Sequence, residues 1–246
     1  MKHFSWQIIL GISLFILCAV FYGVHYAIFR DPHHIFIYLV GDIAFVFFEV
    51  LLVTLIIHQL LSQRERRNRL EKLNMIVGAF FSEVGTKLLA TLSDLDPNLA
   101  EIRQHLVVSS NWSKQEFSNV SRRLRSHHYG VAIQTVDLEN LRSFLVGKRD
   151  SLLRLLENPN LLEHESFTEL LQAVFHLTEE LDARRELTGL PATDYEHFAG
   201  DISRAYTSLA REWLNYMKHL KDNYPYLFSL AMRTNPFDED ASPVVK

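Results

Sequence analysis

The sequence is poor in cysteine and in glycine, and each shortage excludes classes of protein. Cys18 is the single cysteine, so the chain has no disulfide framework. The nine glycines are scattered, and none belongs to a cluster that could cradle a phosphate. The P-loop, GxGxxG, HExxH and GxSxG motifs are all absent. We therefore expect no cofactor, and no motif marks the chain as an enzyme.

An excess of positive charge is also lacking. The 25 Lys and Arg residues are outnumbered by 29 Asp and Glu residues, for a net charge of −4, which argues against nucleic-acid binding. The densest cationic patch of the polar part is Arg122, Arg123 and Arg125, followed by His127 and His128. It is either a solvated helix end, where cations suit the helix dipole, or a contact for anionic lipid or an acidic partner. Interleaved aromatic residues are absent, which disfavours single-stranded nucleic acid.

Charge is scarce throughout the first 61 residues, which contain two long apolar runs. These runs cover residues 6–29 and 35–61 and are joined by the sequence RDPHH. About 20 apolar residues suffice for a helix to cross a bilayer. No small-x-small cleavage site follows the first run, so we expect an uncleaved anchor. Residues 1–61 are therefore predicted to form a two-span transmembrane helical hairpin.

The distribution of Lys and Arg predicts the orientation of this hairpin. Lys2 precedes the first run and Arg30 lies in the turn, whereas a cluster follows the second run. Because cytoplasmic flanks are rich in Lys and Arg, we expect an inner-membrane protein with both termini in the cytoplasm. The same cluster is a candidate contact for lipid headgroups or an acidic partner. It consists of Arg64, Arg66, Arg67, Arg69 and Lys72.

Two carboxylates interrupt the second apolar run. Asp42 and Glu49 are seven residues apart, so they lie on one helix face about 10 Å apart along the axis. Each costs at least about 2.5 kcal/mol near the bilayer centre. His25, close to the outer end of the first run, is within reach of Asp42. The carboxylates either hydrogen-bond in protonated form across a helix interface, line a proton or cation path in an oligomer, or bind a partner membrane protein.

A linker helix is predicted over residues 62–92, continuous with the second run. Its apolar stripe has heptad-like spacing but spans fewer than three heptads. Packing against the protein's own helical bundle is the favoured interpretation, and a parallel coiled coil between subunits is the alternative. The stripe consists of Leu70, Leu73, Val77, Phe80, Val84 and Leu88.

Residues 93–237 are predicted to form an all-helical cytoplasmic domain, followed by a disordered tail over residues 238–246. Capping boxes at Ser113, Ser166 and Thr193 each begin a helix, and Asp137 caps one that runs to Glu157. Amphipathic stripes in the last two long helices predict a common core. The fold class is therefore all-α, with a transmembrane hairpin followed by an antiparallel helical bundle.

Two histidine–carboxylate pairs in this domain resemble metal ligands. His176 and Glu180, and likewise His197 and Asp201, are four residues apart and share a helix face. Around each helix axis, the direction of the pair differs from the centre of the apolar stripe by about 100° or more. They are expected to face water or to flank the core, so no metal site is predicted.

These features favour a non-enzymatic membrane protein that acts as an anchored interaction, signalling or assembly module. The hairpin would provide location and assembly as a homo-oligomer, and the helical bundle would provide a surface for a protein partner. The alternative is an oligomeric proton or cation channel that uses Asp42 and Glu49. An enzyme acting on lipid is a third hypothesis, for which the sequence offers no nucleophile.

Overall fold

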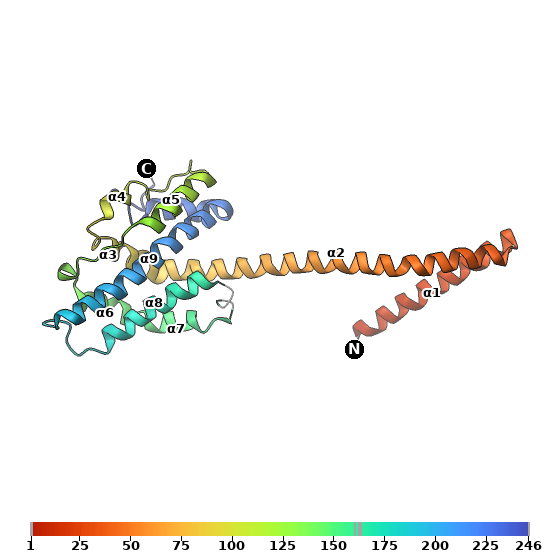
Figure 1. Cartoon of the computed structure of the whole chain (residues 1–246), viewed down its shortest axis with the longest axis horizontal. Helices are drawn as coiled ribbons and strands as arrows, with labels where there is room; N and C mark the ends of the chain where they lie inside the picture. The colour runs from red at the N-terminus through yellow and green to blue at the C-terminus, as the bar shows by residue number, and fades with distance from the viewer. Residues whose placement is uncertain (1, 160, 162–163, 246) are drawn as a thin grey trace. The chain divides into compact units, whose positions relative to one another are not determined.

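The computed structural model describes residues 2–159, 161 and 164–245 and divides into two compact units. The first unit is Met1–Arg66 and the second is Arg67–Lys246, and each is described by itself. The described residues form helices and connecting turns with no strand (Figure 1). The all-α prediction is therefore confirmed.

The first unit contains α1 (Lys2–Phe29) and the beginning of α2 (Pro32–Phe80). The chain reverses at Arg30, which adopts a left-handed conformation with φ of 51°. Asp31 then caps α2, since its carboxylate accepts hydrogen bonds from the backbone N–H groups of His33 (3.0 Å) and His34 (3.3 Å). Pro32 occupies the first helical position, where its missing N–H has no cost. The sequence RDPHH thus both ends one helix and starts the next.

The helices of the first unit expose nearly all of their apolar side chains. Two segments, Ile8–Phe29 and Pro32–Glu65, are long and apolar enough to cross a membrane. In the most apolar 18-residue stretch of each, 0% of the residues are buried. A third segment with this length and composition, Glu71–Ser93, lies in the second unit. In its most apolar 18-residue stretch, 44% of the residues are buried. That burial distinguishes it from the other two.

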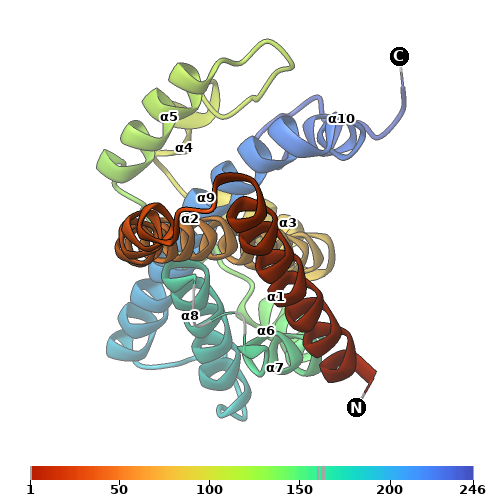
Figure 2. The ribbon, with the colours of Figure 1, turned by 90° about the vertical axis from the view of Figure 1, so that its right-hand side faces the viewer.

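The second unit is a helical bundle built around its longest complete helix, α9 (Ala192–Asn223). This helix contacts α3, α5, α8 and α10. Figure 2 shows α5 and α10 on one side of the unit and α6, α7 and α8 on the other. The remaining elements are a π-helical turn, η1 (Phe81–Gly85), α3 (Thr86–Ser93), α4 (Leu99–Arg103), α5 (Lys114–Ser126), a 3₁₀ turn, η2 (Ile133–Thr135), α6 (Leu138–Val146), α7 (Arg149–Leu156), α8 (Glu165–Asp182) and α10 (Pro225–Arg233).

The apolar stripe of the predicted linker helix packs into the core of this unit. Its described members are buried, and those from Val77 onward belong to the same hydrophobic cluster as α8 and α9, while the side chain of Leu70 lies outside the described residues. Close approach occurs at Gly85, where a Cβ would lie 2.7 Å from the rings of Phe80 and Phe81. The described buried members are Leu73, Val77, Phe80, Val84 and Leu88.

Several predicted helix boundaries differ from those of the structure. The capping box at Ser113 is present, with Glu116 bonded back to the Ser113 N–H. The helix expected from Asp137 to Glu157 is instead two helices, α6 and α7, which break at Gly147 and Lys148. At the start of α8 the cap is His164, whose Nδ1 accepts the Phe167 N–H at 3.2 Å, so the predicted Ser166 box is wrong.

Candidate functional site

A groove in the first unit collects the polar groups of its two helices near the turn. It has a volume of about 740 Å³, and both His25 and Asp42 line it. The ring of His25 stacks on that of His34, with centroids 6.1 Å apart. Within the described residues, the buried Nδ1 of His25 has no hydrogen-bond partner. The other lining residues are Cys18, Phe21, Tyr22, Val24, Ile28, Phe29, Ile35 and Tyr38.

Glu49 is not among the residues that line this groove. It is exposed on α2, as is Asp42. Across residues 2–159, 161 and 164–245, no hydrogen bond or ion pair reaches either carboxylate. Two acidic groups therefore lie on an apolar helix without a neutralising side chain from the described chain.

The cationic residues singled out in the sequence are distributed over two surfaces. Arg64 is exposed, and the side chains of Arg66, Arg67 and Arg69 lie outside the described residues. The predicted patch on α5 consists of exposed guanidinium groups near the helix C-terminus, where cations suit the helix dipole. Its members are Arg122, Arg123 and Arg125.

His127, counted from the sequence as part of that patch, is instead a buried structural residue. Its Nε2 lies 2.9 Å from Asp96 Oδ2, and both side chains are almost fully buried. The other Asp96 oxygen accepts the N–H groups of Asn98 (2.9 Å) and Gly130 (3.3 Å). Burial raises the pKa of neighbouring Tyr206, which keeps that phenol neutral. This network fastens the loops around α4 and α5 to the core.

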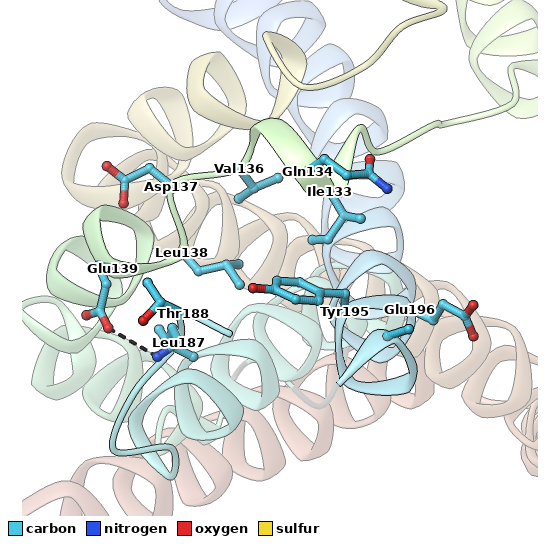
Figure 3. Close-up of a pocket in the computed structure, with 11 residues that line it drawn as sticks. Ile133, Gln134, Val136, Asp137, Leu138, Glu139, Leu187, Thr188, Tyr195 and Glu196 are labelled. Carbon is cyan, nitrogen blue, oxygen red and sulfur yellow. Dashed lines mark hydrogen bonds between the residues drawn. The ribbon is translucent and has the colours of Figure 1, made fainter. Parts of the chain in front are cut away.

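A pocket of about 530 Å³ opens where η2 and α6 meet the loop before α9 (Figure 3). Ile133, Leu138 and Leu187 are buried and give it an apolar floor. Figure 3 shows Leu138 and Tyr195 pointing toward one another in its middle. The pocket is therefore large enough for an aliphatic or aromatic side chain of a partner.

The rim of this pocket is acidic. Asp137, Glu139 and Glu196 line it, and none of its lining residues is Lys or Arg. Glu139 Oε1 accepts the Leu187 N–H at 3.3 Å and Oε2 lies 2.5 Å from Arg142, so this side chain fixes the loop. Asp137 caps α6, and Glu196 is exposed. An apolar floor with the exposed carboxylate of Glu196 at its edge suits a ligand that joins an apolar group to a cation.

No local motif predicts this pocket, because its residues come from two stretches far apart in the chain, residues 133–139 and 187–196. The two histidine–carboxylate pairs were visible in the sequence, and the structure brings them together between α8 and α9. Asp201 is buried there, although it was expected to face water or to flank the core.

Comparison with known proteins identifies relatives along almost the whole chain. A family model described as the N-terminal helical domain of MJ1433 matches residues 1–61. A second, described as the C-terminal helical domain of the uncharacterized protein MJ1433, matches residues 69–233. The uncharacterized protein MJ1433 of Methanocaldococcus jannaschii is 46% identical over 238 residues, which cover 97% of this chain and 96% of that protein. No solved structure matches the chain.

Proposed function

The chain belongs to the MJ1433 family, and we propose that it is an integral membrane protein whose first unit anchors a helical binding module. The observation that carries this proposal is the exposure of apolar side chains along both helices of the first unit. A soluble protein rarely exposes contiguous apolar patches above a few hundred Å². In a bilayer the same surface contacts lipid at no cost, and each helix satisfies its own backbone hydrogen bonds.

The proposed orientation has both termini in the cytoplasm and the turn at Arg30 outside. Lys and Arg are concentrated after the second apolar segment, which supports this topology. The unpaired Asp42 and Glu49 support assembly as a homo-oligomer, because a neighbouring subunit can provide hydrogen bonds that lipid cannot.

The pocket in Figure 3 is the proposed partner-binding surface of the module. Its acidic rim and apolar floor favour a protein segment in which an apolar side chain lies beside Lys or Arg. The charge of the rim would select and orient such a segment, and burial of the apolar side chain would provide most of the affinity.

Cysteine labelling tests the anchoring and its orientation. In a Cys18→Ala background, single cysteines are placed at His33 in the turn and at Asn111 in the second unit, which are both exposed. A membrane-impermeant maleimide should label position 33 in intact cells and position 111 only after permeabilisation. Equal labelling of both positions in intact cells, or release of the protein from membranes by alkaline carbonate, would contradict the proposal.

Site-specific cross-linking tests the pocket. A photoreactive residue at Gln134, which lines the pocket, should give a discrete adduct in native membranes, and one at exposed Asn119 on α5 should not. Glu196→Lys reverses the rim charge at an exposed position and should abolish the Gln134 adduct. Identical adducts from both positions, or adducts insensitive to Glu196→Lys, would rule the pocket out as the partner surface.

A second candidate function, an oligomeric proton or cation channel, is favoured by one observation. Asp42 and Glu49 lie two turns apart on an exposed face of α2, and Asp42 shares a groove with His25. Purified protein in liposomes should then conduct protons or potassium, and Glu49→Gln should abolish the flux. Flux no greater than that of empty liposomes, in a folded and inserted preparation, would leave the carboxylates with a role in assembly.

A further inference from the structure

Two helices of the second unit place four potential metal ligands around one point. His176 and Glu180 are one turn apart on α8, and His197 and Asp201 are one turn apart on α9. Because residues four apart share a helix face, each pair presents two ligands in one direction. The helices α8 and α9 lie against each other, so the two pairs meet at the edge of their interface.

Several distances between these groups are close to those of a metal coordination sphere. Asp201 Oδ2 is 3.4 Å from His176 Nε2 and 3.3 Å from His197 Nε2. Glu180 closes the other side, with carboxylate oxygens 3.9 Å from His176 Nε2 and 3.5 Å from His197 Nε2. In a tetrahedral zinc site with bonds of about 2.0–2.1 Å, neighbouring ligand atoms are about 3.3 Å apart. The ligand atoms of His176, Glu180 and His197 all lie within 4.8 Å of one another, and Asp201 lies next to both imidazoles, so rotation of these side chains would bring all four onto one ion.

A buried oxygen without a hydrogen bond gives independent support. The side chain of Asp201 is only 3% exposed, and its Oδ2, which is aimed at both imidazoles, has no hydrogen-bond partner within the described residues. Its Oδ1 accepts a hydrogen bond from Arg204 Nη1 at 2.9 Å, which fixes the orientation of the carboxylate. Leaving a charged oxygen buried and unbonded is costly, and a bound cation would remove that cost.

Neighbouring groups hold the ligands in position. Arg184 donates to Glu180 Oε2 at 2.7 Å and also pairs with Asp194, so Glu180 is held from outside the cluster. The hydrogen bond from Arg184 lowers the pKa of Glu180. Outer partners of this kind orient ligands in known metal sites.

The cluster is open on one side, which allows an ion to enter. The side chains of His176 and His197 are 46% and 47% exposed. His176 also lines a shallow pocket of about 370 Å³ together with Arg204 and Ser208. An ion could therefore reach Asp201 Oδ2 without any opening of the helical bundle.

We infer that His176, Glu180, His197 and Asp201 form a binding site for a divalent transition-metal ion. Imidazole nitrogens and carboxylate oxygens select metals such as Zn²⁺ over Mg²⁺ and Ca²⁺, which prefer oxygen ligands only. A bound ion would join α8 to α9 near their exposed ends and so link two helices that otherwise meet only through apolar contacts and ion pairs. This site is independent of the proposed membrane anchoring and of the partner pocket.

Metal titration of the full-length protein in detergent tests the site directly. The protein is purified without a histidine tag, stripped with chelator and titrated with Zn²⁺ near pH 7.5 by calorimetry. We expect one Zn²⁺ per chain and a rise in the unfolding temperature when the metal is added, because the ion binds only the folded state. A folded protein that binds no Zn²⁺ would overturn the inference.

Three variants make this test specific. His176→Gln and His197→Gln change half-exposed side chains, so the fold should survive, and each should weaken Zn²⁺ binding by more than the about 10–100-fold caused by losing an outer partner. His128→Gln is the matched control, because His128 is exposed and its side chain lies outside the cluster. Equal affinity and equal thermal shift in all three variants would place any bound zinc elsewhere and refute the site.

A spectroscopic measurement distinguishes this geometry from adventitious binding. Co²⁺ in a four-coordinate site absorbs visible light far more strongly than hydrated Co²⁺. The wild-type protein and His128→Gln should show this absorption, and it should disappear in His197→Gln. Weak, octahedral-type absorption in the wild type would contradict the proposed convergence of four protein ligands.

Discussion

The first and second units use the same residue types in opposite environments. Phe47 on the first unit's part of α2 is 74% exposed, whereas Phe80 at the end of the same helix is fully buried among Phe81 and Phe167. Charged groups follow the same division. Asp42 and Glu49 have no partner in the described chain, while Asp96 and Glu180 are bonded on several sides. The second unit thus pairs these charges internally, whereas under the proposed anchoring the lipid and a neighbouring subunit would complete the environment of the first.

Truncating one phenylalanine in each unit gives the largest expected contrast. Phe167→Ala removes a fully buried ring and should lower the free energy of unfolding of the second unit by about 3–5 kcal/mol. Phe47→Ala, the matched control, removes an exposed ring and should leave that value unchanged. Urea unfolding of the full-length protein in detergent, followed by tryptophan fluorescence, measures both. Equal losses would mean that Phe47 also packs against protein.

The buried pair of Asp96 and His127 should be the next most sensitive feature. Asp96→Ala leaves His127 buried without its partner and removes the acceptor for two backbone N–H groups, so we expect a loss of about 3 kcal/mol. The exposed pair of Arg103 and Glu239 is the control, and Glu239→Ala should have little effect. Thermal unfolding of both variants would check this, and a larger loss for Glu239→Ala would contradict it.

Glycine substitutions test the close packing at the junction of η1 and α3. Gly85→Ala places a Cβ against the rings of Phe80 and Phe81 and should destabilise the second unit by about 1–3 kcal/mol. Gly200→Ala in α9 meets nothing within 4 Å and should stabilise it by about 0.5–1 kcal/mol. Opposite signs in denaturant unfolding are the expected result. Stabilisation by both substitutions would show that the ring contacts at Gly85 are absent.

Two serines separate true from apparent helix caps. Ser113→Ala removes the side-chain hydroxyl that accepts the Glu116 N–H, one of the two hydrogen bonds of the capping box, and should cost about 1 kcal/mol. Ser166→Ala should cost less than about 0.5 kcal/mol, because His164 caps α8 instead. Chemical denaturation of the two variants measures the difference. A larger loss of stability for Ser166→Ala than for Ser113→Ala would support the Ser166 cap predicted from the sequence.

The smallest expected effect concerns acid stability. Arg184 lowers the pKa of both Glu180 and Asp194 through hydrogen bonds. The folded state therefore binds protons less readily than the unfolded state, so this stabilisation is complete above the unfolded pKa values of about 4 and disappears as pH falls further. With a chelator present to remove metal, the free energy of unfolding of Arg184→Gln should decrease less below about pH 5 than that of the wild type. An unchanged pH profile would show that these pairs contribute nothing.

The sequence predicted the elements with local signals and missed what depends on neighbours. The all-α class and the Ser113 cap follow from periodicity and capping residues close together in the chain. The break between α6 and α7 has one local signal, Gly147, which the apolar periodicity on both sides of it outweighs, and the cap at His164 has none, because histidine is an uncommon cap.

The candidate sites show the same limit. The pocket in Figure 3 combines residues about 60 positions apart, such as Asp137 and Glu196, so no local motif exists to reveal it. For His176 and Asp201, helical phase was measured from the centre of each helix's own apolar stripe. That angle does not take into account the edge of the interface between α8 and α9. Side chains that flank the apolar stripes of two packed helices converge at this edge.

The native Cys18 offers the most direct test of the contrast between the two units. It is exposed on α1, so a spin label can be attached to the unmodified chain reconstituted in liposomes. In the lipid interior the label should collide readily with oxygen and rarely with a water-soluble nickel chelate. A label at Asn111, in a Cys18→Ala background, should show the opposite preference. Nickel access at Cys18 equal to that at position 111 would mean that the first unit lies in water, and the proposed membrane anchor would be wrong.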